Sequence, residues 1–281
     1  MSANSAVGES QNYASRFVTL AWLSLARLVR SPSHSRRAEA ARRAARHGLW
    51  LSAGLGGAII VLMYALDAWE IGQMPPRGAP SLWWVRILTD FGKDEYVLAA
   101  LAVLLIAVAF VLPALRGIQR SLLLGLGTRL QFLFFAVAAS SLVTEVIKWC
   151  VGRGRPFVGG EANVFNFSHF AGTPAYSSFP SGHATTAFAL AVAVAAVWPR
   201  ARVAMAVYAL IIAASRLVLL AHHPSDVVAG ALVGIIGAMF VRYWFAARRL
   251  GFAIQRDGAI VSLVGPSSGR LKRVARGASA P

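Results

Sequence analysis

Residues suited to binding an anion and moving a proton gather at positions 180–183, with the sequence Pro-Ser-Gly-His. This stretch directly precedes a long apolar run, residues 184–198. Ser181 is a preferred type of helix N-cap, and Gly182 lets the backbone approach a ligand closely. A helix that begins here would aim free N–H groups and the positive end of its dipole at one point, which favours an anion. His183, in the first turn, can donate or accept a proton near neutral pH.

A second candidate pair is His222 and Asp226, which flank Pro224. The Asp226 carboxylate could keep one ring nitrogen of His222 protonated and leave the other as a nucleophile, as in other oriented-base pairs. A proline at the first helical position with an acid in the first turn is also common at helix starts. Both interpretations of Asp226 remain open on these residues alone.

Cationic side chains flank these positions. Lys148, Arg153 and Arg155 surround the end of one apolar segment, and Arg216 lies about two turns before the end of another. A charge inside a membrane segment costs about 2.5–3.5 kcal/mol on insertion scales, so Arg216 needs a partner or a function. Lys148 and Arg153 could also be topology charges that snorkel to the surface. Glu145, one turn before Lys148, predicts either a simple ion pair or a group that positions the lysine.

Metal binding is the main chemical alternative. The stretch 145–226 contains three acids: Glu145, Glu161 and Asp226. These are too few for a magnesium or two-metal carboxylate site. Zinc bound by His183, His222 and His169 is compatible with the residue types, but no zinc-type spacing is present. We therefore expect no metal and no cofactor.

The elements that must position these residues are membrane helices. The chain is 57% hydrophobic and 14% charged, with a mean hydropathy of +0.59, whereas soluble domains carry about 25% charged residues. Several apolar runs reach the roughly 20 residues needed to cross a bilayer. The sequence predicts an all-α polytopic membrane protein with six transmembrane helices in a bundle. The expected spans are 49–69, 96–115, 130–149, 182–198, 203–221 and 226–246.

The net charge of +17 is distributed as a topology signal. Basic residues cluster at the chain ends and in the second and fourth loops, which predicts that these regions and both termini are cytoplasmic. We therefore expect contact with anionic headgroups and no nucleic-acid partner. The candidate residues then lie in or beside the third and fifth loops, on the outer face. Cys150 is the single cysteine, so no internal disulfide can form.

The expected domain organisation has three parts. Residues 1–48 form a basic N-terminal region, in which an interfacial helix is expected over 14–30. Residues 49–250 form the six-helix membrane domain, and residues 251–281 form a basic, flexible tail. Within the sixth segment, Gly230 and Gly234 form a small-xxx-small pair that permits close helix packing.

Three motifs in order carry a resemblance to a known family. They are Lys148, six residues and Arg155-Pro156; then residues 180–183; then Ser215-Arg216, five residues, His222, three residues and Asp226. In residue types, order and spacing they resemble the tripartite signature of the type 2 phosphatidic acid phosphatase superfamily. The resemblance covers about residues 49–246, and the six-segment layout is similar to the membrane branch of lipid phosphate phosphatases.

The resemblance implies a role for each motif residue. Lys148, Arg155 and Arg216 would bind the phosphoryl oxygens, assisted by Ser181 and the Gly182 backbone N–H. His222, oriented by Asp226, would attack phosphorus and form a phosphohistidine. His183 would protonate the leaving lipid oxygen, and water would then release phosphate. Three fixed cations would neutralise the phosphoryl charge in place of a metal.

The expected function is therefore metal-independent dephosphorylation of a lipid phosphate or diphosphate that enters from the outer leaflet of a bacterial inner membrane. Polyprenyl diphosphate, phosphatidic acid, phosphatidylglycerophosphate and lipid A phosphate are the candidate substrates. Two alternatives remain open on the sequence. One is a lipid phosphotransferase that uses the same intermediate, and the other is a non-catalytic transporter of a lipid or anion, for which an intramembrane Arg216 would also be suitable.

Overall fold

The computed structural model describes residues 13–156, 158 and 163–263 of the chain. Its long helices are α1 (Tyr13–Val29), α2 (Arg37–Ala65), α5 (Asp94–Val111), α6 (Gly117–Val151), α7 (Gly182–Val197), α8 (Arg202–Val218) and α9 (Pro224–Ala247). Two shorter α-helices are α3 (Asp67–Gln73) and α4 (Trp83–Asp90). Single 3-10 turns are η1 (Pro80–Leu82), η2 (Leu112–Ala114), η3 (Pro174–Tyr176) and η4 (Pro199–Ala201). The strands are β1 (Phe252–Ile254) and β2 (Ile260–Ser262).

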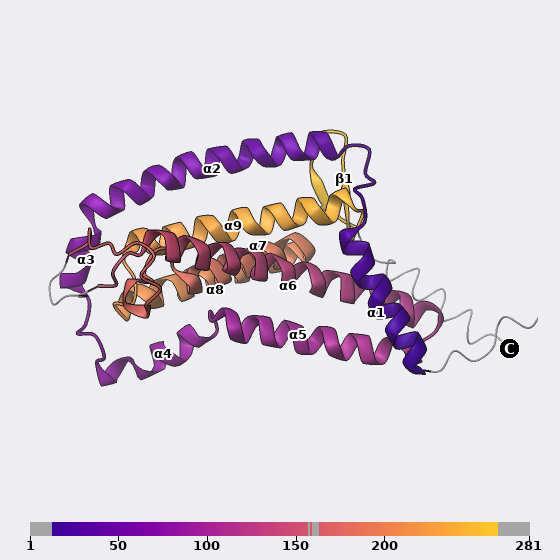
Figure 1. Ribbon diagram of the computed structural model, residues 1–281, viewed down its shortest axis with the longest axis horizontal. Coiled ribbons are helices and arrows are strands. Elements are labelled where there is room, and N and C mark those ends of the chain that lie inside the picture. Colours follow the sequence, from indigo (N-terminus) through magenta and orange to yellow (C-terminus); the bar gives the residue numbers. More distant parts are fainter. Residues whose placement is uncertain (1–12, 157, 159–162, 264–281) are drawn as a thin grey trace, which may run out of the picture.

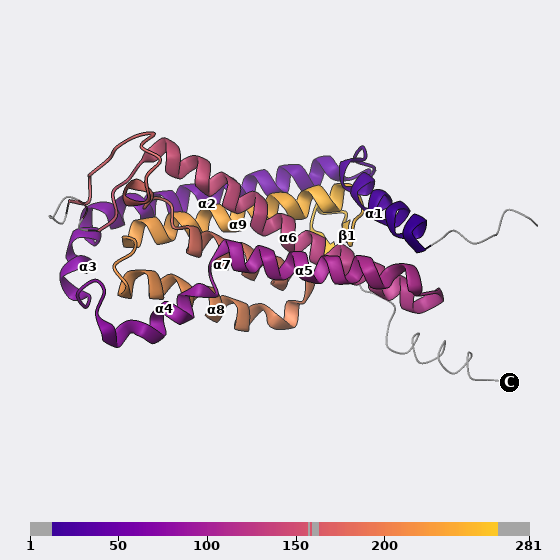
Figure 2. The same cartoon turned by 60° about the horizontal axis from the view of Figure 1, so that its bottom comes forward.

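Apart from α1, the long helices run roughly along one axis, and α7 and α9 lie in the middle of the bundle (Figures 1 and 2). Helix α9 contacts α2, α6 and α7, and α7 also contacts α6 and α8, while α5 packs on α6. Helix α1 crosses one end of the bundle. The short helices α3 and α4 and the connection between α6 and α7 lie at the other end.

The two central helices approach each other closely because of two glycines. A Cβ on Gly230 would lie 2.4 Å from the Ser181 carbonyl oxygen, and a Cβ on Gly234 would lie 2.4 Å from the Thr185 carbonyl oxygen. Neither position therefore has room for a side chain. This confirms the close packing predicted for the Gly230/Gly234 pair. The close packing also places the start of α9 in contact with the start of α7. The second and third motifs therefore lie next to each other.

Five helical stretches in the described part of the chain are long and apolar enough to cross a membrane. They are Arg37–Ala65, Pro80–Ala114, Gly117–Val151, Pro199–Val218 and Pro224–Ala247. The chain is therefore an integral membrane protein. The remaining predicted span is α7, whose 16 residues extend about 24 Å, less than the roughly 30 Å of a bilayer core. Six crossings remain a prediction.

Two helices begin well before the predicted spans. Helix α2 begins at Arg37 and α6 at Gly117, so Arg120 and Arg129, expected in a loop, lie on α6. For α2, the reason is the Ala- and Arg-rich composition of residues 37–46, since both residue types favour helix. The basic segments extend the spanning helices beyond the apolar runs. The expected interfacial helix at 14–30 is present as α1, at Tyr13–Val29.

Residues 251–281 were expected to be a flexible tail, and their first part is folded. Strands β1 and β2 form an antiparallel hairpin in which Phe252 pairs with Ser262. Phe252 and Ile254 are buried in the main hydrophobic core beside Phe132 and Phe245. Residues 264–281 and 1–12 lie outside the described part of the chain.

Candidate active site

The three motifs meet at the end of the bundle opposite α1 (Figure 1). Their residues come from the end of α6, the α6–α7 connection, the first turn of α7, the end of α8, the α8–α9 loop and the first turn of α9. Ser181 links two of them directly, since its backbone N–H donates to the Asp226 carbonyl oxygen at 2.9 Å. The sequence-predicted residues are thus collected at one end of the fold.

The start of α7 has the features expected of an anion site. Ser181 is the N-cap residue in extended conformation, and Gly182 is the first helical residue. A Cβ on Gly182 would lie 3.1 Å from Lys148 Nζ, so the lysine reaches the start of the helix. Ser181 Oγ and His183 Nε2 are buried and have no hydrogen-bond partner within the described residues. Polar atoms of this kind, beside free N–H groups, suit a bound anion.

Lys148 and Arg155 are held by their own segments. Lys148 Nζ lies 2.5 Å from Glu145 Oε1, so the simple i, i+3 ion pair predicted from the sequence is present. The Arg155 backbone N–H donates to the Ala175 carbonyl oxygen, and its Nε donates to the Pro174 carbonyl oxygen, both at 2.9 Å. These bonds fix the start of the Arg155 side chain and leave its terminal nitrogens available for an oxyanion.

Arg216 is oriented by a residue that no motif contains. Its Nη1 donates to Thr89 Oγ1 at 2.9 Å, and Ser215 Oγ lies 3.0 Å from the same oxygen. Thr89 belongs to α4, which packs on α8. Arg216 is 7% exposed, and its Nε has no partner in the described part of the protein. The sequence offered no signal for Thr89, because a single threonine in a short amphipathic segment is not distinctive.

His222 is buried in the α8–α9 loop, and its Nδ1 lies 2.8 Å from the Ser178 carbonyl oxygen. The Asp226 Oδ2 atom is farther away, 3.8 Å from the same nitrogen. A carbonyl oxygen accepts, so this contact places the ring proton on Nδ1 and leaves Nε2 unprotonated. Burial lowers the pKa of His222 to about 4; Arg216 and Arg155 also lower it, while Asp226 opposes them. The imidazole is therefore neutral at pH 7.

The Asp226 carboxylate organises the residues around His222. Its Oδ2 accepts from Ser178 Oγ at 2.6 Å and from the His223 backbone N–H at 2.9 Å. The second contact is part of a capping box that starts α9, so the helix-start interpretation of Asp226 is correct. The same carboxylate holds Ser178, whose carbonyl oxygen accepts from His222. Asp226 therefore acts on His222 through Ser178 as well as through its charge.

Arg153 is completely buried and joins two carboxylates. Its Nη1 lies 2.7 Å from Asp226 Oδ1, and its Nη2 lies 2.8 Å from Asp67 Oδ2. Asp67, at the start of α3, also accepts from the backbone N–H and hydroxyl of Ser225. Neither of the roles considered for Arg153, snorkelling or topology, fits this burial. Asp67 was missed. An acid inside an expected membrane span should have raised the same question as Arg216.

Two further ionisable groups lie next to this network. Glu70, also on α3, is 4% exposed, and neither of its carboxylate oxygens has a partner within the described residues. Burial raises the pKa of Glu70 to about 7, and the charges of Asp67 and Asp226 contribute in the same direction. His223 is fully buried, and burial lowers its pKa. It is the N-cap residue of α9 and is buried at the start of that helix.

His169, considered as a zinc ligand, lies apart from the other histidines. It is exposed, its Nδ1 lies 3.2 Å from the Cys150 carbonyl oxygen, and its ring stacks on Phe167. Over residues 13–156, 158 and 163–263, no group of three or more His, Cys, Asp or Glu side chains is arranged to hold a metal ion.

Comparison with known proteins agrees with the three motifs. Residues 129–250 match the family model of the PAP2 superfamily. The chain is 39% identical over 127 residues to a lipid A 1-phosphatase of Rhizobium johnstonii, covering 45% of this chain and 52% of that one. It is 37% identical over 127 residues to the Rhizobium etli protein of the same name, covering 45% and 55%. The chain thus spans about half the length of these relatives.

A third relative is matched over more of its length. The chain is 37% identical over 180 residues to the Escherichia coli protein named "Putative undecaprenyl-diphosphatase YbjG", covering 62% of this chain and 79% of that one. No solved structure gives a significant match. Residues 129–250 match the family model, and the chain covers 79% of the third relative. The chain therefore belongs to the PAP2 superfamily, the type 2 phosphatidic acid phosphatase superfamily that its three motifs resemble.

Proposed function

We propose that this protein is a membrane phosphatase that removes a phosphoryl group from a lipid phosphate or diphosphate through a phosphohistidine at His222. The observation that carries the proposal is the 2.8 Å contact between His222 Nδ1 and the Ser178 carbonyl oxygen. It supports a neutral imidazole with Nε2 available as the nucleophile. Arg155 and Arg216, which help to lower the pKa of this histidine, supply positive charge where a phosphoryl group would bind.

The proposed reaction has two steps. His222 Nε2 attacks phosphorus and the bond from phosphorus to the lipid oxygen breaks, while His183 donates a proton to that oxygen. Water then attacks the phosphohistidine, His183 takes a proton from it, and phosphate leaves as the N–P bond breaks. For a diphosphate, the first leaving group is the lipid monophosphate. General acid–base catalysis of this kind contributes about 10²–10⁴-fold to a rate.

The proposed phosphate site consists of Lys148, Arg155, Arg216, Ser181 and Gly182. Phosphoryl transfer depends mostly on positioning and on neutralising the charge of the equatorial oxygens, and three fixed cations can do both. The buried Ser181 Oγ and Arg216 Nε have no partner in the described part of the chain, which is consistent with an oxyanion as their partner. A water-excluded setting strengthens each of these contacts.

The names of the relatives narrow the substrate class. Two are called lipid A 1-phosphatases and one an undecaprenyl-diphosphatase. We propose the glycolipid phosphate and the polyprenyl diphosphate as the first substrates to test, ahead of phosphatidic acid and phosphatidylglycerophosphate. All are membrane lipids whose phosphate lies at the headgroup level, where the start of α7 would lie if the six predicted segments cross the membrane.

We propose that the site faces the outer leaflet of a bacterial inner membrane and that both termini are cytoplasmic. The support is the charge distribution along the bundle. The basic starts of α2 and α6 and the end of α1 lie at the end away from the site (Figure 1), as does the end of α9, which Arg248 and Arg249 follow directly. Clusters of Lys and Arg mark the cytoplasmic side of membrane proteins.

Phosphate release from purified full-length protein in detergent, over the four lipids, tests the proposal. His222→Ala should abolish turnover, and His183→Ala should reduce it by about 10²–10⁴-fold. His169→Ala, an exposed histidine outside the site, is the matched control and should keep full activity. Full activity of His222→Ala on the preferred lipid would overturn the mechanism.

Two further measurements distinguish a hydrolase from a phosphotransferase and from a transporter. An acid-labile phosphoryl adduct on the wild type, absent from His222→Ala, is expected for both a hydrolase and a phosphotransferase. Thin-layer analysis distinguishes them, because a phosphotransferase yields a phosphorylated acceptor and a hydrolase yields free phosphate. A transporter would give neither product.

A further inference from the structure

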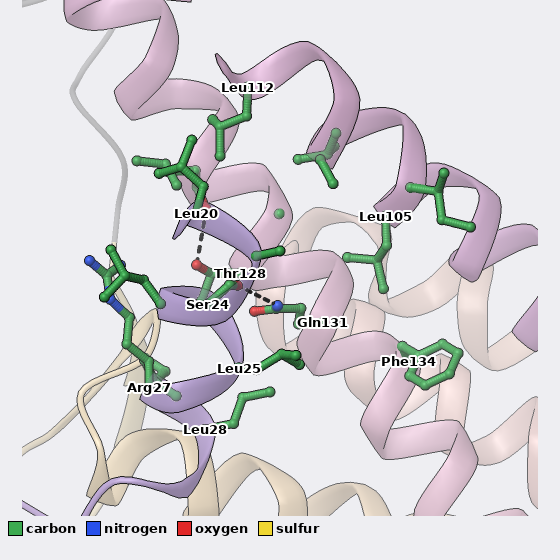
Figure 3. Close-up of a pocket in the computed structure, with 18 of the residues that line it drawn as sticks. Leu20, Ser24, Leu25, Arg27, Leu28, Leu105, Leu112, Thr128, Gln131 and Phe134 are labelled. Atoms are coloured by element: carbon green, nitrogen blue, oxygen red, sulfur yellow. Dashed lines mark hydrogen bonds between the residues drawn. The ribbon is translucent and has the colours of Figure 1, made fainter. Parts of the chain in front are cut away.

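A separate cavity lies at the basic end of the bundle, where α1 crosses α5 and α6 (Figure 3). Its volume is about 630 Å³, which falls within the roughly 300–1,000 Å³ of ordinary ligand sites. The walls are mainly aliphatic and aromatic, with Leu20 and Leu28 from α1, Leu105 from α5 and Phe134 from α6. The cavity is therefore chemically suited to a hydrocarbon chain, and it shares no residue with the candidate active site.

The cavity exists because α1 is fixed to the bundle at its two ends. Near its N-terminus, the Tyr13 hydroxyl donates to the Phe110 carbonyl oxygen, and Phe17 stacks on the Phe110 ring with centroids 5.1 Å apart. Near its C-terminus, Trp244 Nε1 donates to the Leu28 carbonyl oxygen at 3.1 Å. Between these attachments α1 does not pack fully on α5 and α6.

One polar contact crosses the space between α1 and α6. Gln131 Nε2 donates to Ser24 Oγ at 2.7 Å, as Figure 3 shows. The other lining positions of α1 include Leu23 and Leu25, which are 46% and 56% exposed. On an interfacial helix such leucine side chains contact hydrocarbon.

A smaller basic pocket adjoins the cavity and shares Leu20, Leu23 and Arg120 with it. Its volume is about 350 Å³, and Arg16 and Arg116 also line it. Arg16, Arg116 and Arg120 have neither an ion pair nor a side-chain hydrogen bond to any residue in the ranges 13–156, 158 and 163–263. Helix α6 begins at Gly117, so its free N–H groups and positive dipole end lie beside Arg116. The pocket therefore complements an anion.

We propose that this composite site binds an anionic phospholipid, with an acyl chain in the apolar cavity and the headgroup phosphate between Arg16, Arg116 and Arg120. The apolar cavity adjoins the basic pocket, as the acyl chains of a phospholipid adjoin its phosphate group. Basic pockets between transmembrane helices at one membrane face bind anionic headgroups by this combination of charge and apolar contact. The lipid completes the interface between α1 and the bundle and is a ligand distinct from the substrate.

Native mass spectrometry of the purified full-length protein, with added phosphatidylglycerol or phosphatidylcholine of equal chain length, tests the charge requirement. Two arginines near a lipid phosphate contribute about 1 kcal/mol each, so the double variant Arg116→Gln/Arg120→Gln should bind phosphatidylglycerol about 30-fold more weakly. The matched control is Arg42→Gln/Arg46→Gln, two exposed arginines on α2 that line neither pocket. Its binding should equal that of the wild type.

A second pair of variants tests the cavity. Ala109 lines it, and Ala107, two residues earlier on α5, is exposed outside it. Ala109→Phe should displace the acyl chain and reduce lipid retention, whereas Ala107→Phe should not. Three results would each overturn the proposal. The first is that the wild type retains phosphatidylcholine as well as phosphatidylglycerol. The others are that the two double arginine variants lose equal affinity, or that Ala109→Phe and Ala107→Phe retain equal amounts of lipid. All these variants leave the proposed catalytic residues intact, so phosphatase activity in detergent serves as a folding check and can succeed or fail independently.

Discussion

Arg153 and Asp67 form a buried ion pair, with Arg153 Nη2 2.8 Å from Asp67 Oδ2. The other terminal nitrogen of the same guanidinium lies 2.7 Å from Asp226 Oδ1. The pair thereby connects α3 to the segment that carries Arg155 and to the first turn of α9. The fully buried Arg153 guanidinium thus joins three segments that are far apart in the sequence, close to His222.

Asp67→Asn should strongly destabilise this network. Removing one partner of a buried ion pair costs about 3–5 kcal/mol, because the remaining charge stays buried. We expect a large fall in the melting temperature in detergent and a fall in kcat, since the position of Asp226 depends on Arg153. The control is Asp257→Asn, which alters the exposed pair between Asp257 and Arg43 and should leave both quantities unchanged. A wild-type melting temperature for Asp67→Asn would contradict the structural role.

Ser178→Ala separates the two contacts that Ser178 makes. The change removes the hydroxyl that donates to Asp226 but keeps the carbonyl oxygen that accepts from His222. We expect kcat to fall about 2- to 13-fold, which corresponds to the net 0.5–1.5 kcal/mol of a typical hydrogen bond, with KM little changed. Asp226→Asn should lower kcat further, because it also removes the carboxylate charge that pairs with Arg153. If Ser178→Ala were as inactive as Asp226→Asn, the hydroxyl rather than the carboxylate would control the histidine.

Thr89→Val should weaken substrate binding. Thr89 accepts from Arg216 Nη1, so the nearly isosteric valine leaves the guanidinium without its protein partner. We expect KM for the lipid phosphate to rise several-fold, with a smaller change in kcat, as measured by phosphate release. Thr89→Ser keeps the oxygen and should restore KM. Failure of serine to rescue would show that the threonine methyl group, and not the hydrogen bond, positions Arg216.

The sequence predicted the membrane class, the segment order and the motif residues that the fold collects at one end. These features depend on local patterns: apolar runs, basic loops and fixed spacings. It did not reveal Asp67, Thr89 or Ser178, because each acts through a contact between segments 40 or more residues apart. The early starts of α2 and α6 were missed for a related reason, since hydropathy marks the apolar part of a helix and not its basic extension.

Glu70→Gln should change how stability depends on pH. The pKa of Glu70 is about 7 in the folded protein and 4.5 for the free side chain. The folded state therefore binds more protons between these values, and the wild type loses stability as pH rises from about 4.5 to 7. The melting temperature of Glu70→Gln minus that of the wild type should increase from pH 5 to pH 8. The exposed Glu95→Gln should show no such trend, and a flat difference for Glu70→Gln would contradict a buried, neutral carboxyl group.

Gly230→Ala should separate α9 from α7. The added Cβ would lie 2.4 Å from the Ser181 carbonyl oxygen, which belongs to the backbone and cannot move without shifting the start of α7. Because the nearby Ser181 N–H also donates to Asp226, the shift would disturb the phosphate site and the histidine loop together. We expect a lower melting temperature and a loss of kcat. The matched substitution is Gly57→Ala on α2, where nothing lies within 4 Å of the new Cβ. There alanine should be neutral or slightly stabilising, as its higher helix propensity implies. Equal melting temperatures for the two variants would show that α7 and α9 are not in the close contact on which the site depends.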